Sequence, residues 1–473
     1  MKVKKVQFVR LAPWMGISDP HPQDRRYNFT VAQVMSLLDD NKYEIDFIDG
    51  YVENLNINII NKRIESFDPE IFLLTTSSNS SKYATRIFNS LKKLKPNIFL
   101  CAFGQHAHYS PETFLNASLN IDAIVHGEPE ETIVELIKLL PKNSSDKKKL
   151  RGLYFWDNQL IKTSDRELRV NLDDWPMPKY EIFKGFDYSI VSLNFPRFRN
   201  VKAGWLLTSR GCPYQCTFCS PSIRRSFGIR LRKNTPERIA DSFKYLSEKL
   251  NVNTISIADD TFSLDMEWAE EVSNELIRRN NDVQFAITTR ADRLNEKLII
   301  KLKAAGMIAA GIGVETGSAN VMERIKKTEK LSDIENSFKL LNKYNISTNV
   351  TVIVGHIDET IKELNETFNF LFKINPTFVQ LHHLTPYPGT KIKGLFDEKY
   401  GSIENISHYN DEPLNMSKIN NDLLNKSIKS FYLRYYLSVS FVKKYFRNRV
   451  FYTLANPIKE YNLIKSSLRY FTK

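Results

Sequence analysis

Cysteine is scarce in this sequence, with four residues in 473 and none before residue 101. A secreted protein held together by disulfides would carry an even set of cysteines spread along the chain. Here three of the four fall within eight residues. This distribution excludes a disulfide-stapled scaffold and indicates a metal site in a reducing compartment. We therefore expect the protein to be cytoplasmic.

Long apolar runs are also absent. No stretch reaches the ~18 apolar residues that a membrane-spanning helix requires. The first residues, Met1 to Val6, have neither the apolar region nor the small-residue cleavage site of a signal peptide. The hydrophobic fraction of 42% and the aromatic fraction of 12% are nonetheless high enough for packed cores, and the length predicts two or three domains.

Positive charge is concentrated at one end of the chain. From Asn421 to Lys473 there are eleven Lys and Arg residues against two acidic residues, a net charge of +9 out of +13 for the whole sequence. We expect residues 396–473 to form a C-terminal helical extension that is basic and rich in aromatic residues. It could pack as a cap on the rest of the protein, which we favour, lie on an anionic membrane surface, or contact nucleic acid. No motif of a sequence-reading nucleic-acid module is visible.

The first 141 residues alternate between strand-like and helix-like segments. The predicted strands are 6–11, 43–48, 71–75, 98–102 and 123–125. Strict alternation predicts an α/β domain with a doubly wound, parallel five-stranded sheet of the flavodoxin-like kind, with helices on both faces. Ligands of such sheets bind at the carboxyl ends of the strands.

A second alternating series occupies residues 201–395. The segment before it, 142–200, is polar at its start and contains a proline-rich turn, so we predict a linker there. The predicted strands of the second series are 204–208, 253–258, 283–288, 308–314, 347–354 and 377–384. Six strands joined by helices indicate a partial (β/α)6 barrel, which carries its chemistry on the loops that follow the strands.

The clustered cysteines, Cys212, Cys216 and Cys219, follow the first strand of this barrel with the spacing CxxxCxxC. Thiolates bind iron–sulfur clusters, and a four-iron cluster normally takes four of them. Three thiolates leave one iron without a protein ligand, and an open position is typical of a catalytic metal site. The alternatives are an incomplete zinc site or buried structural cysteines. Zinc would want a fourth Cys or His nearby, and none lies close in the sequence.

This motif, with an aromatic residue before its last cysteine, resembles the signature of radical S-adenosylmethionine (SAM) enzymes, and the resemblance spans roughly 200–395. It implies that the three cysteines bind a 4Fe–4S cluster whose open iron binds SAM. One electron from the cluster would cleave SAM to a 5′-deoxyadenosyl radical. The resemblance also implies an electron donor such as flavodoxin or ferredoxin.

The same resemblance implies SAM contacts after successive barrel strands. Asp259 or Asp260, after the second strand, would bind the methionyl amino group. Arg290, after the third, would pair with the methionyl carboxylate, and Glu315, after the fourth, would accept hydrogen bonds from the ribose hydroxyls. The aromatic Phe218 belongs to the same implied set.

The first domain resembles the cobalamin-binding domain of one subclass of these enzymes. Loops after its third, fourth and fifth strands carry the implied cobalamin contacts Thr76, Ser77, Gly104, Gln105, Gly127 and Glu128. Small residues there would let a flat corrin and its nucleotide tail approach the backbone closely. His21 lies where other cobalamin proteins carry a lower cobalt ligand, which this subclass usually lacks. Cys101 is expected to be a buried small hydrophobe.

Together these resemblances imply a cobalamin-dependent radical SAM enzyme that methylates an unactivated carbon of a small-molecule or lipid-like substrate. The alternatives are a radical cyclase, oxidase or rearrangement enzyme and, from another class, a non-enzymatic corrinoid or iron–sulfur sensor. A methylthiotransferase is disfavoured because the first domain contains only Cys101, and no cysteine follows Cys219 to bind an auxiliary cluster. Nucleic acid is not an expected partner, whereas the basic tail leaves peripheral membrane contact open.

Overall fold

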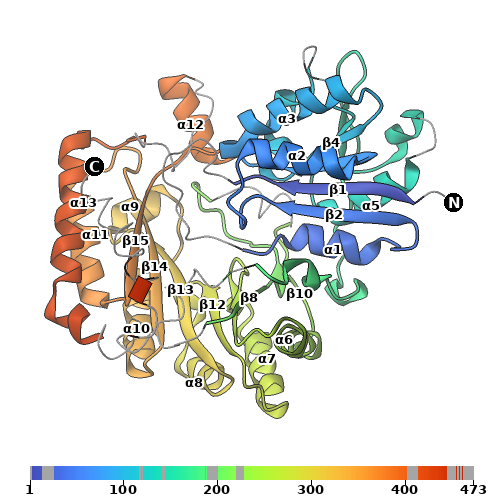
Figure 1. Ribbon diagram of the computed structural model, residues 1–473. Coiled ribbons are helices and arrows are strands. Elements are labelled where there is room, and N and C mark those ends of the chain that lie inside the picture. Colours follow the sequence, from blue (N-terminus) through green and yellow to red (C-terminus); the bar gives the residue numbers. More distant parts are fainter. Residues whose placement is uncertain are drawn as a thin grey trace.

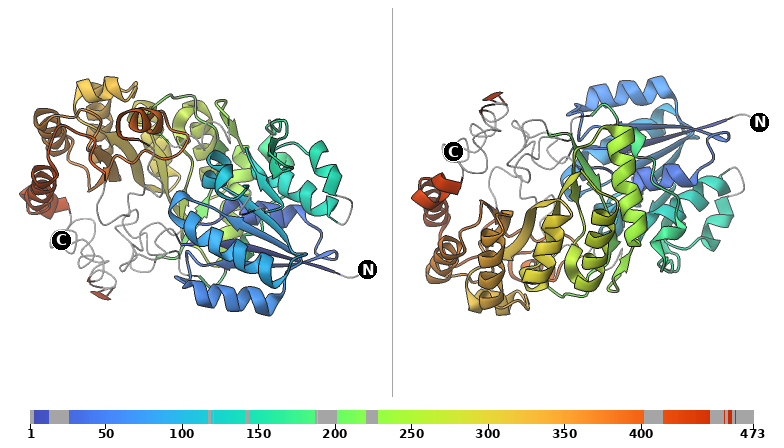
Figure 2. Two further views of the ribbon diagram at one scale, coloured as in Figure 1. Left: turned by 90° about the horizontal axis from the view of Figure 1, so that it is seen from above. Right: turned by 90° about the horizontal axis from the view of Figure 1, so that it is seen from below.

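Two α/β units and a C-terminal helix make up the computed structural model (Figure 1). The structure describes residues 3–12, 26–116, 119, 121–140, 144–186, 188, 201–219, 228–401, 414–444, 454, 457, 458 and 461. The two units lie side by side, and the views from above and below agree with this arrangement (Figure 2).

The first unit is built on a sheet with the strand order β2-β1-β3-β4-β5-β6-β7. Its parallel strands are β1 (Lys4–Arg10), β2 (Tyr43–Asp49), β3 (Ile71–Thr75), β4 (Phe99–Phe103) and β5 (Ala123–Val125). This confirms the predicted five-stranded parallel sheet, and the order of these five strands is that of flavodoxin-like folds.

Two further strands extend this sheet. β6 (Leu153–Trp156) and β7 (Leu160–Lys162) form an antiparallel hairpin, and β6 pairs with β5. The prediction of a linker over residues 142–200 is therefore wrong for this part. The turn places Asn158 in the left-handed region, at φ 58°, which Asn tolerates better than most residues.

Helices cover both faces of the first sheet and create two separate cores. The helices α1 (Phe29–Leu37) and α5 (Pro129–Leu139) bury their apolar residues on one face, in a cluster that includes Cys101. On the other face lie α2 (Ile57–Phe67) and α3 (Ser81–Leu94). Cys101 is fully buried, which confirms its predicted place in the core.

The second unit is an open parallel barrel with the strand order β15-β14-β13-β12-β11-β8. Its strands are β8 (Ala203–Leu206), β11 (Thr254–Ile257), β12 (Gln284–Thr289), β13 (Met307–Glu315), β14 (Ser347–Val354) and β15 (Phe378–His383). The helices are α6 (Pro236–Leu250), α7 (Met266–Arg278), α8 (Glu296–Ala304), α9 (Ala319–Arg324), α10 (Leu331–Lys343), α11 (Ile361–Ile374) and α12 (Lys391–Tyr400). The predicted (β/α)6 barrel is confirmed.

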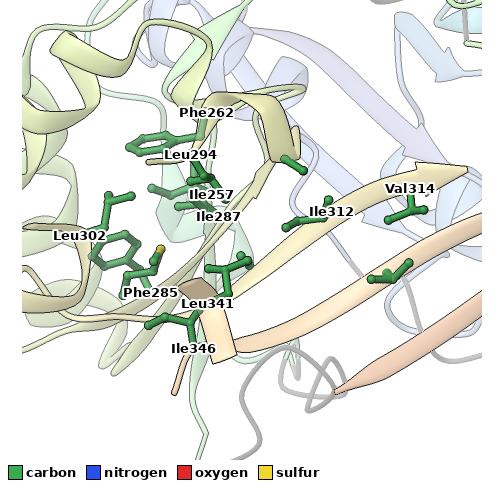
Figure 3. Close-up of a cluster of buried hydrophobic side chains, with 14 of the residues drawn as sticks. Ile257, Phe262, Phe285, Ile287, Leu294, Leu302, Ile312, Val314, Leu341 and Ile346 are labelled. Atoms are coloured by element: carbon green, nitrogen blue, oxygen red, sulfur yellow. The ribbon is translucent and has the colours of Figure 1, made fainter. Parts of the chain in front are cut away.

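The core of this unit lies between strands and helices. Figure 3 shows Ile257, Ile287 and Ile312, from three neighbouring strands, in one cluster with Leu302 of α8 and Leu341 of α10. Each of these side chains is at most 1% exposed. Because the core fills the space between sheet and helices, it fixes the strand ends from which the functional loops depart.

The helix α13 (Asn421–Tyr436) covers the edge of the barrel sheet at β15 and lies beside α11 (Figure 1). Phe431 stacks on Phe368 with ring centroids 4.6 Å apart. The hydroxyls of Tyr432 and Tyr436 accept hydrogen bonds from backbone amides of β15 at 2.9 and 3.1 Å. An uncovered edge strand is a site of aggregation, so this helix protects the sheet. The main described element of the tail is thus a helix, as predicted.

Within the part of the chain that the structure describes, no helix is both long and apolar enough to cross a bilayer.

Candidate active site

The cysteine loop leaves the barrel after β8 and the short strand β9 (Ser209–Arg210). None of the four cysteines, all of which are described, forms a disulfide. Burial, and after it the charges of Cys216 and Cys212, raise the pKa of the Cys219 thiol to about 12. The three sulfur atoms are therefore close enough to interact. A bound iron–sulfur cluster would hold them as thiolates, and a partly exposed trio fits one.

Among the described residues, which include all four cysteines, no group of three or more His, Cys, Asp and Glu side chains is arranged to hold a single ion.

The start of the cysteine loop is fixed by hydrogen bonds to a buried carboxylate. Asp259 accepts hydrogen bonds from the amides and hydroxyls of Thr208 and Ser209, at 2.5 to 3.1 Å. Gly211 follows at φ 99°, and a Cβ on it would lie 2.1 Å from the carbonyl oxygen of Arg230. Only glycine fits there. The chain therefore enters the cysteine motif along one fixed path.

The middle of the loop is fixed through Tyr214. The Arg290 guanidinium lies 3.6 Å from the centroid of the Tyr214 ring, and Arg293 Nε donates a hydrogen bond to the Tyr214 hydroxyl at 2.8 Å. Arg290 also makes two hydrogen bonds to Asp292, at 2.9 and 3.0 Å. The structure thus places Arg290 against the cysteine loop. Its contact with the methionyl carboxylate stays a prediction.

Asp260 and Glu315 lie within electrostatic reach of the cysteines, since both raise the pKa of Cys219. Burial, together with Asp259, raises the pKa of Asp260 to about 7. Glu315 ends β13 at φ 65°, beside a register shift in the sheet. Burial raises its pKa and Lys327 opposes that rise. Because the carboxylate of Asp259 already accepts four hydrogen bonds, Asp260 is the better candidate for the methionyl amino group.

Phe218 packs against an apolar cluster at the start of α12. This cluster contains Leu384, Ile392, Phe396 and Met416. The contact ties the end of the cysteine loop to the chain beyond β15. A role for Phe218 in SAM binding stays a prediction.

Replacing Arg290 or Glu315 with alanine should weaken SAM binding without loss of iron. Each change removes a charge next to the cysteine loop, and a lost charge-assisted hydrogen bond costs about 1.5–3 kcal/mol. The measurement is a SAM titration of each cluster-loaded variant. Arg278→Ala is the control, because Arg278 is exposed and pairs with Glu275 on α7. Unchanged affinity in both variants would show that neither side chain contacts SAM.

The predicted cobalamin loops lie at the carboxyl ends of β3, β4 and β5. The hydroxyl of Thr76 donates a hydrogen bond to the Phe103 carbonyl and accepts one from the Ala107 amide, both at 3.0 Å. Gly104 adopts φ 99°, and a Cβ on it would lie 2.8 Å from the Thr76 carbonyl oxygen. Thr76 and Gly104 therefore brace two loops against each other. Glycine is required at 104 by this packing alone.

The other predicted cobalamin residues differ in their surroundings. Ser77 Oγ lies 2.9 Å from Ser80 Oγ at the start of α3, and Gln105 is exposed at the start of α4 (Gln105–Tyr109). Gly127 has φ 75°, and no atom lies within 4 Å of the position a Cβ would take. Its amide donates a hydrogen bond to His108 Nδ1 at 2.9 Å. The loop is thus open at Gly127, which fits the close approach of a flat ligand.

Glu128 faces the barrel. Its carboxylate accepts hydrogen bonds from Arg210 at 2.6 Å and from Arg232 at 3.0 Å, and Arg210 also donates to Glu130 at 2.9 Å. A direct contact of Glu128 with cobalamin stays a prediction. Sequence reasoning missed Arg210, Arg232 and Glu130, because they come together only when the two units pack. The predicted alternative ligand His21 lies outside the described residues.

The chain thus combines an α/β unit that has an open strand-end loop with a barrel unit that carries the clustered cysteine loop. The family model of the Radical SAM superfamily matches residues 206–371, and that of the B12 binding domain matches residues 26–137. The protein is therefore a radical SAM enzyme with an N-terminal B12-binding domain, as predicted. The cofactors of these domains are a 4Fe–4S cluster, SAM and cobalamin.

The chain is similar to several curated and solved proteins. It is 29% identical to the uncharacterized methyltransferase PH0819 of Pyrococcus horikoshii, over 83% of this chain and 85% of the relative. It is 24% identical to the anaerobic magnesium-protoporphyrin IX monomethyl ester cyclase of Rubrivivax gelatinosus, over 85% of this chain and 72% of the relative. The cobalamin-dependent SAM radical enzyme OxsB shares its fold, with a TM-score of 0.71 and 19% identity over 91% of this chain and 67% of OxsB.

Proposed function

We propose that the protein is a cobalamin-dependent radical SAM methyltransferase that acts on an unactivated carbon of a small-molecule or lipid-like substrate. One observation carries this proposal. The loop that is open at Gly127 continues into Glu128, which is bound by Arg210, two residues before the first cysteine of the motif. The two expected cofactor sites therefore adjoin. The methyltransferase name of the Pyrococcus relative supports the same activity.

The protein's own residues have distinct parts in this proposal. Cys212, Cys216 and Cys219 would hold the cluster, and Asp260 and Glu315 would orient SAM beside it. The bound cofactors supply a 5′-deoxyadenosyl radical, which opens a C–H bond, and a methyl group carried on cobalt. The fold contributes fixed loops, since Asp259 and Tyr214 anchor the cysteine loop.

A radical cyclase is the second candidate. The similarity to the Rubrivivax cyclase extends over 85% of this chain, so the same two-unit frame also serves that chemistry. In such an enzyme the cobalamin would not carry a methyl group to the substrate.

A labelling experiment separates the two candidates. The protein, loaded with its cluster and hydroxocobalamin under anaerobic conditions, is incubated with reductant and SAM that carries a deuterated methyl group. A methyltransferase will transfer the labelled methyl group to the corrin, which mass spectrometry detects. Formation of 5′-deoxyadenosine with no labelled methylcobalamin would favour the cyclase and contradict methyl transfer.

We also propose that a flavodoxin or ferredoxin delivers the electron that reduces the cluster.

We propose further that the tail contacts an anionic membrane surface. The outward face of α13 supports this contact, since Leu433 is 52% exposed and Leu437, just after the helix, is 75% exposed, next to Arg434. The protein should sediment with phosphatidylserine vesicles at low salt and much less with phosphatidylcholine vesicles. Equal sedimentation with both would contradict an electrostatic membrane contact.

A further inference from the structure

Two arginines of the barrel unit meet two glutamates of the cobalamin unit in the interior. Arg210 and Arg232 lie opposite each other on the paired strands β9 and β10 (Arg232–Lys233). Arg210 donates to Glu128 at 2.6 Å and to Glu130 at 2.9 Å, and Arg232 donates twice to Glu128 at 3.0 Å. All four side chains are at most 7% exposed. The network joins the two units through fully desolvated charges.

The stability of the fold does not by itself account for this network. Removing charges from water is costly, and apolar residues of similar size often stabilise a fold as well as a buried ion pair does. The network instead fixes the relative orientation of the groups it joins, because a planar guanidinium binds a carboxylate in a fixed orientation that a flexible ammonium does not impose. The Arg210 guanidinium also lies 4.9 Å from the centroid of the Trp175 ring, which restricts its position further.

The network also connects the two predicted cofactor loops directly, through the contact of Arg210 with Glu128. Glu128 directly follows Gly127, the open position at the end of β5. Arg210 is followed by Gly211, which packs so closely against the Arg230 carbonyl that a Cβ would lie 2.1 Å from its oxygen, and then by Cys212. A shift of Arg210 relative to Glu128 would therefore move one cofactor loop relative to the other.

We propose that Arg210, held by Glu128 and Glu130, is a positioning residue that sets the separation between the cobalamin loop and the cluster loop. This inference rests on the proposed function, since it requires both cofactors to bind. Transfer of a group between two cofactors depends strongly on distance, and a misplacement of about 1 Å far from the chemistry can cost on the order of 100-fold in rate.

The test uses variants that keep the network electrically balanced. Arg210→Gln combined with Glu130→Gln removes one cation and one anion and leaves the Glu128–Arg232 pair in place. Arg210→Lys keeps the charge but loses the fork that binds two carboxylates, and serves if the double variant fails to fold. Arg166→Gln is the matched control, because Arg166 also binds α5, through Glu131 and Glu135, but does not contact the cysteine loop.

The measurement is the magnetic interaction between the reduced cluster and cob(II)alamin in the full-length protein, by electron paramagnetic resonance. Iron content and corrin content are measured first. We expect the Arg210 variants to load both cofactors and to show a weaker or more widely distributed interaction. Their methylcobalamin formation from SAM should fall by roughly 10- to 100-fold. The control should match the wild type in both respects.

Three results would overturn the inference, and they are distinguishable. An unchanged magnetic interaction and an unchanged methylation rate in fully loaded Arg210 variants would overturn the positioning role while the proposed function stands. Wild-type protein that retains its cluster but no corrin would overturn both. The same loss of interaction in Arg166→Gln would also contradict the inference, because it would trace the effect to α5 in general.

Discussion

Replacing Cys212, Cys216 and Cys219 together with alanine is expected to abolish both the iron–sulfur cluster and all cleavage of SAM, while Cys101→Ala leaves both intact. The reason is geometric. The three thiols share one anchored loop and influence one another's ionisation, whereas Cys101 is fully buried in the core of the first sheet. Without thiolates the loop offers iron no ligands of comparable strength.

Iron and sulfide counting, electron paramagnetic resonance and detection of 5′-deoxyadenosine check this prediction on both variants. Cys101→Ala is the control for the loss of a buried sulfur, and it should cost only about 1 kcal/mol of stability. A reduced-cluster signal of normal size in the triple variant would contradict the assignment of the cluster to this loop.

Gly127→Trp should fold and retain its cluster but lose cobalamin. Gly127 has open space where a side chain would begin, so the indole ring would occupy the volume that the corrin or its tail needs. The left-handed backbone at φ 75° costs a non-glycine residue about 1–2 kcal/mol, which a folded domain of this size tolerates. Corrin binding should fall below detection.

The matched pair for this prediction is Gly127→Ala and Gly104→Ala. Gly127→Ala carries the same backbone cost with little added volume and should retain much of the corrin. Gly104→Ala brings its Cβ to 2.8 Å from the Thr76 carbonyl oxygen and should destabilise the first unit itself. Corrin retention after gel filtration and thermal unfolding are the measurements. Full corrin retention in Gly127→Trp would show that this loop does not border the cobalamin site.

The sequence predicts most of the frame of this molecule because its strands are short, apolar and bounded by polar turns. The strand β14, for example, begins at Ser347 and ends at Val354 as predicted, because the apolar alternation of its sequence stops before Gly355. The sequence does not predict the hairpin of β6 and β7, because its strands have only four and three residues. Such strands are defined by pairing with a neighbour, which no local pattern shows.

The candidate site can likewise be predicted from the sequence only in part. The cysteine trio is readable from spacing alone, since three thiols four and three residues apart must share one loop. The different roles of Asp259 and Asp260 cannot be predicted from the sequence, because the two aspartates are adjacent and chemically identical. Only the structure shows that Thr208 and Ser209 bind Asp259. Glu128 likewise resembled a ligand residue, and only the packing of the two units shows that two arginines occupy its carboxylate.

The central claim is that one protein holds an iron–sulfur cluster that cleaves SAM and, beside it, a corrin. Its most direct measurement is anaerobic reconstitution with iron, sulfide and hydroxocobalamin, followed by gel filtration, absorbance and a SAM-cleavage assay with reductant. We predict one 4Fe–4S cluster and one corrin for each chain, with 5′-deoxyadenosine formed on reduction. A folded, cluster-loaded protein that retains no corrin, or one that releases no 5′-deoxyadenosine, would contradict the account.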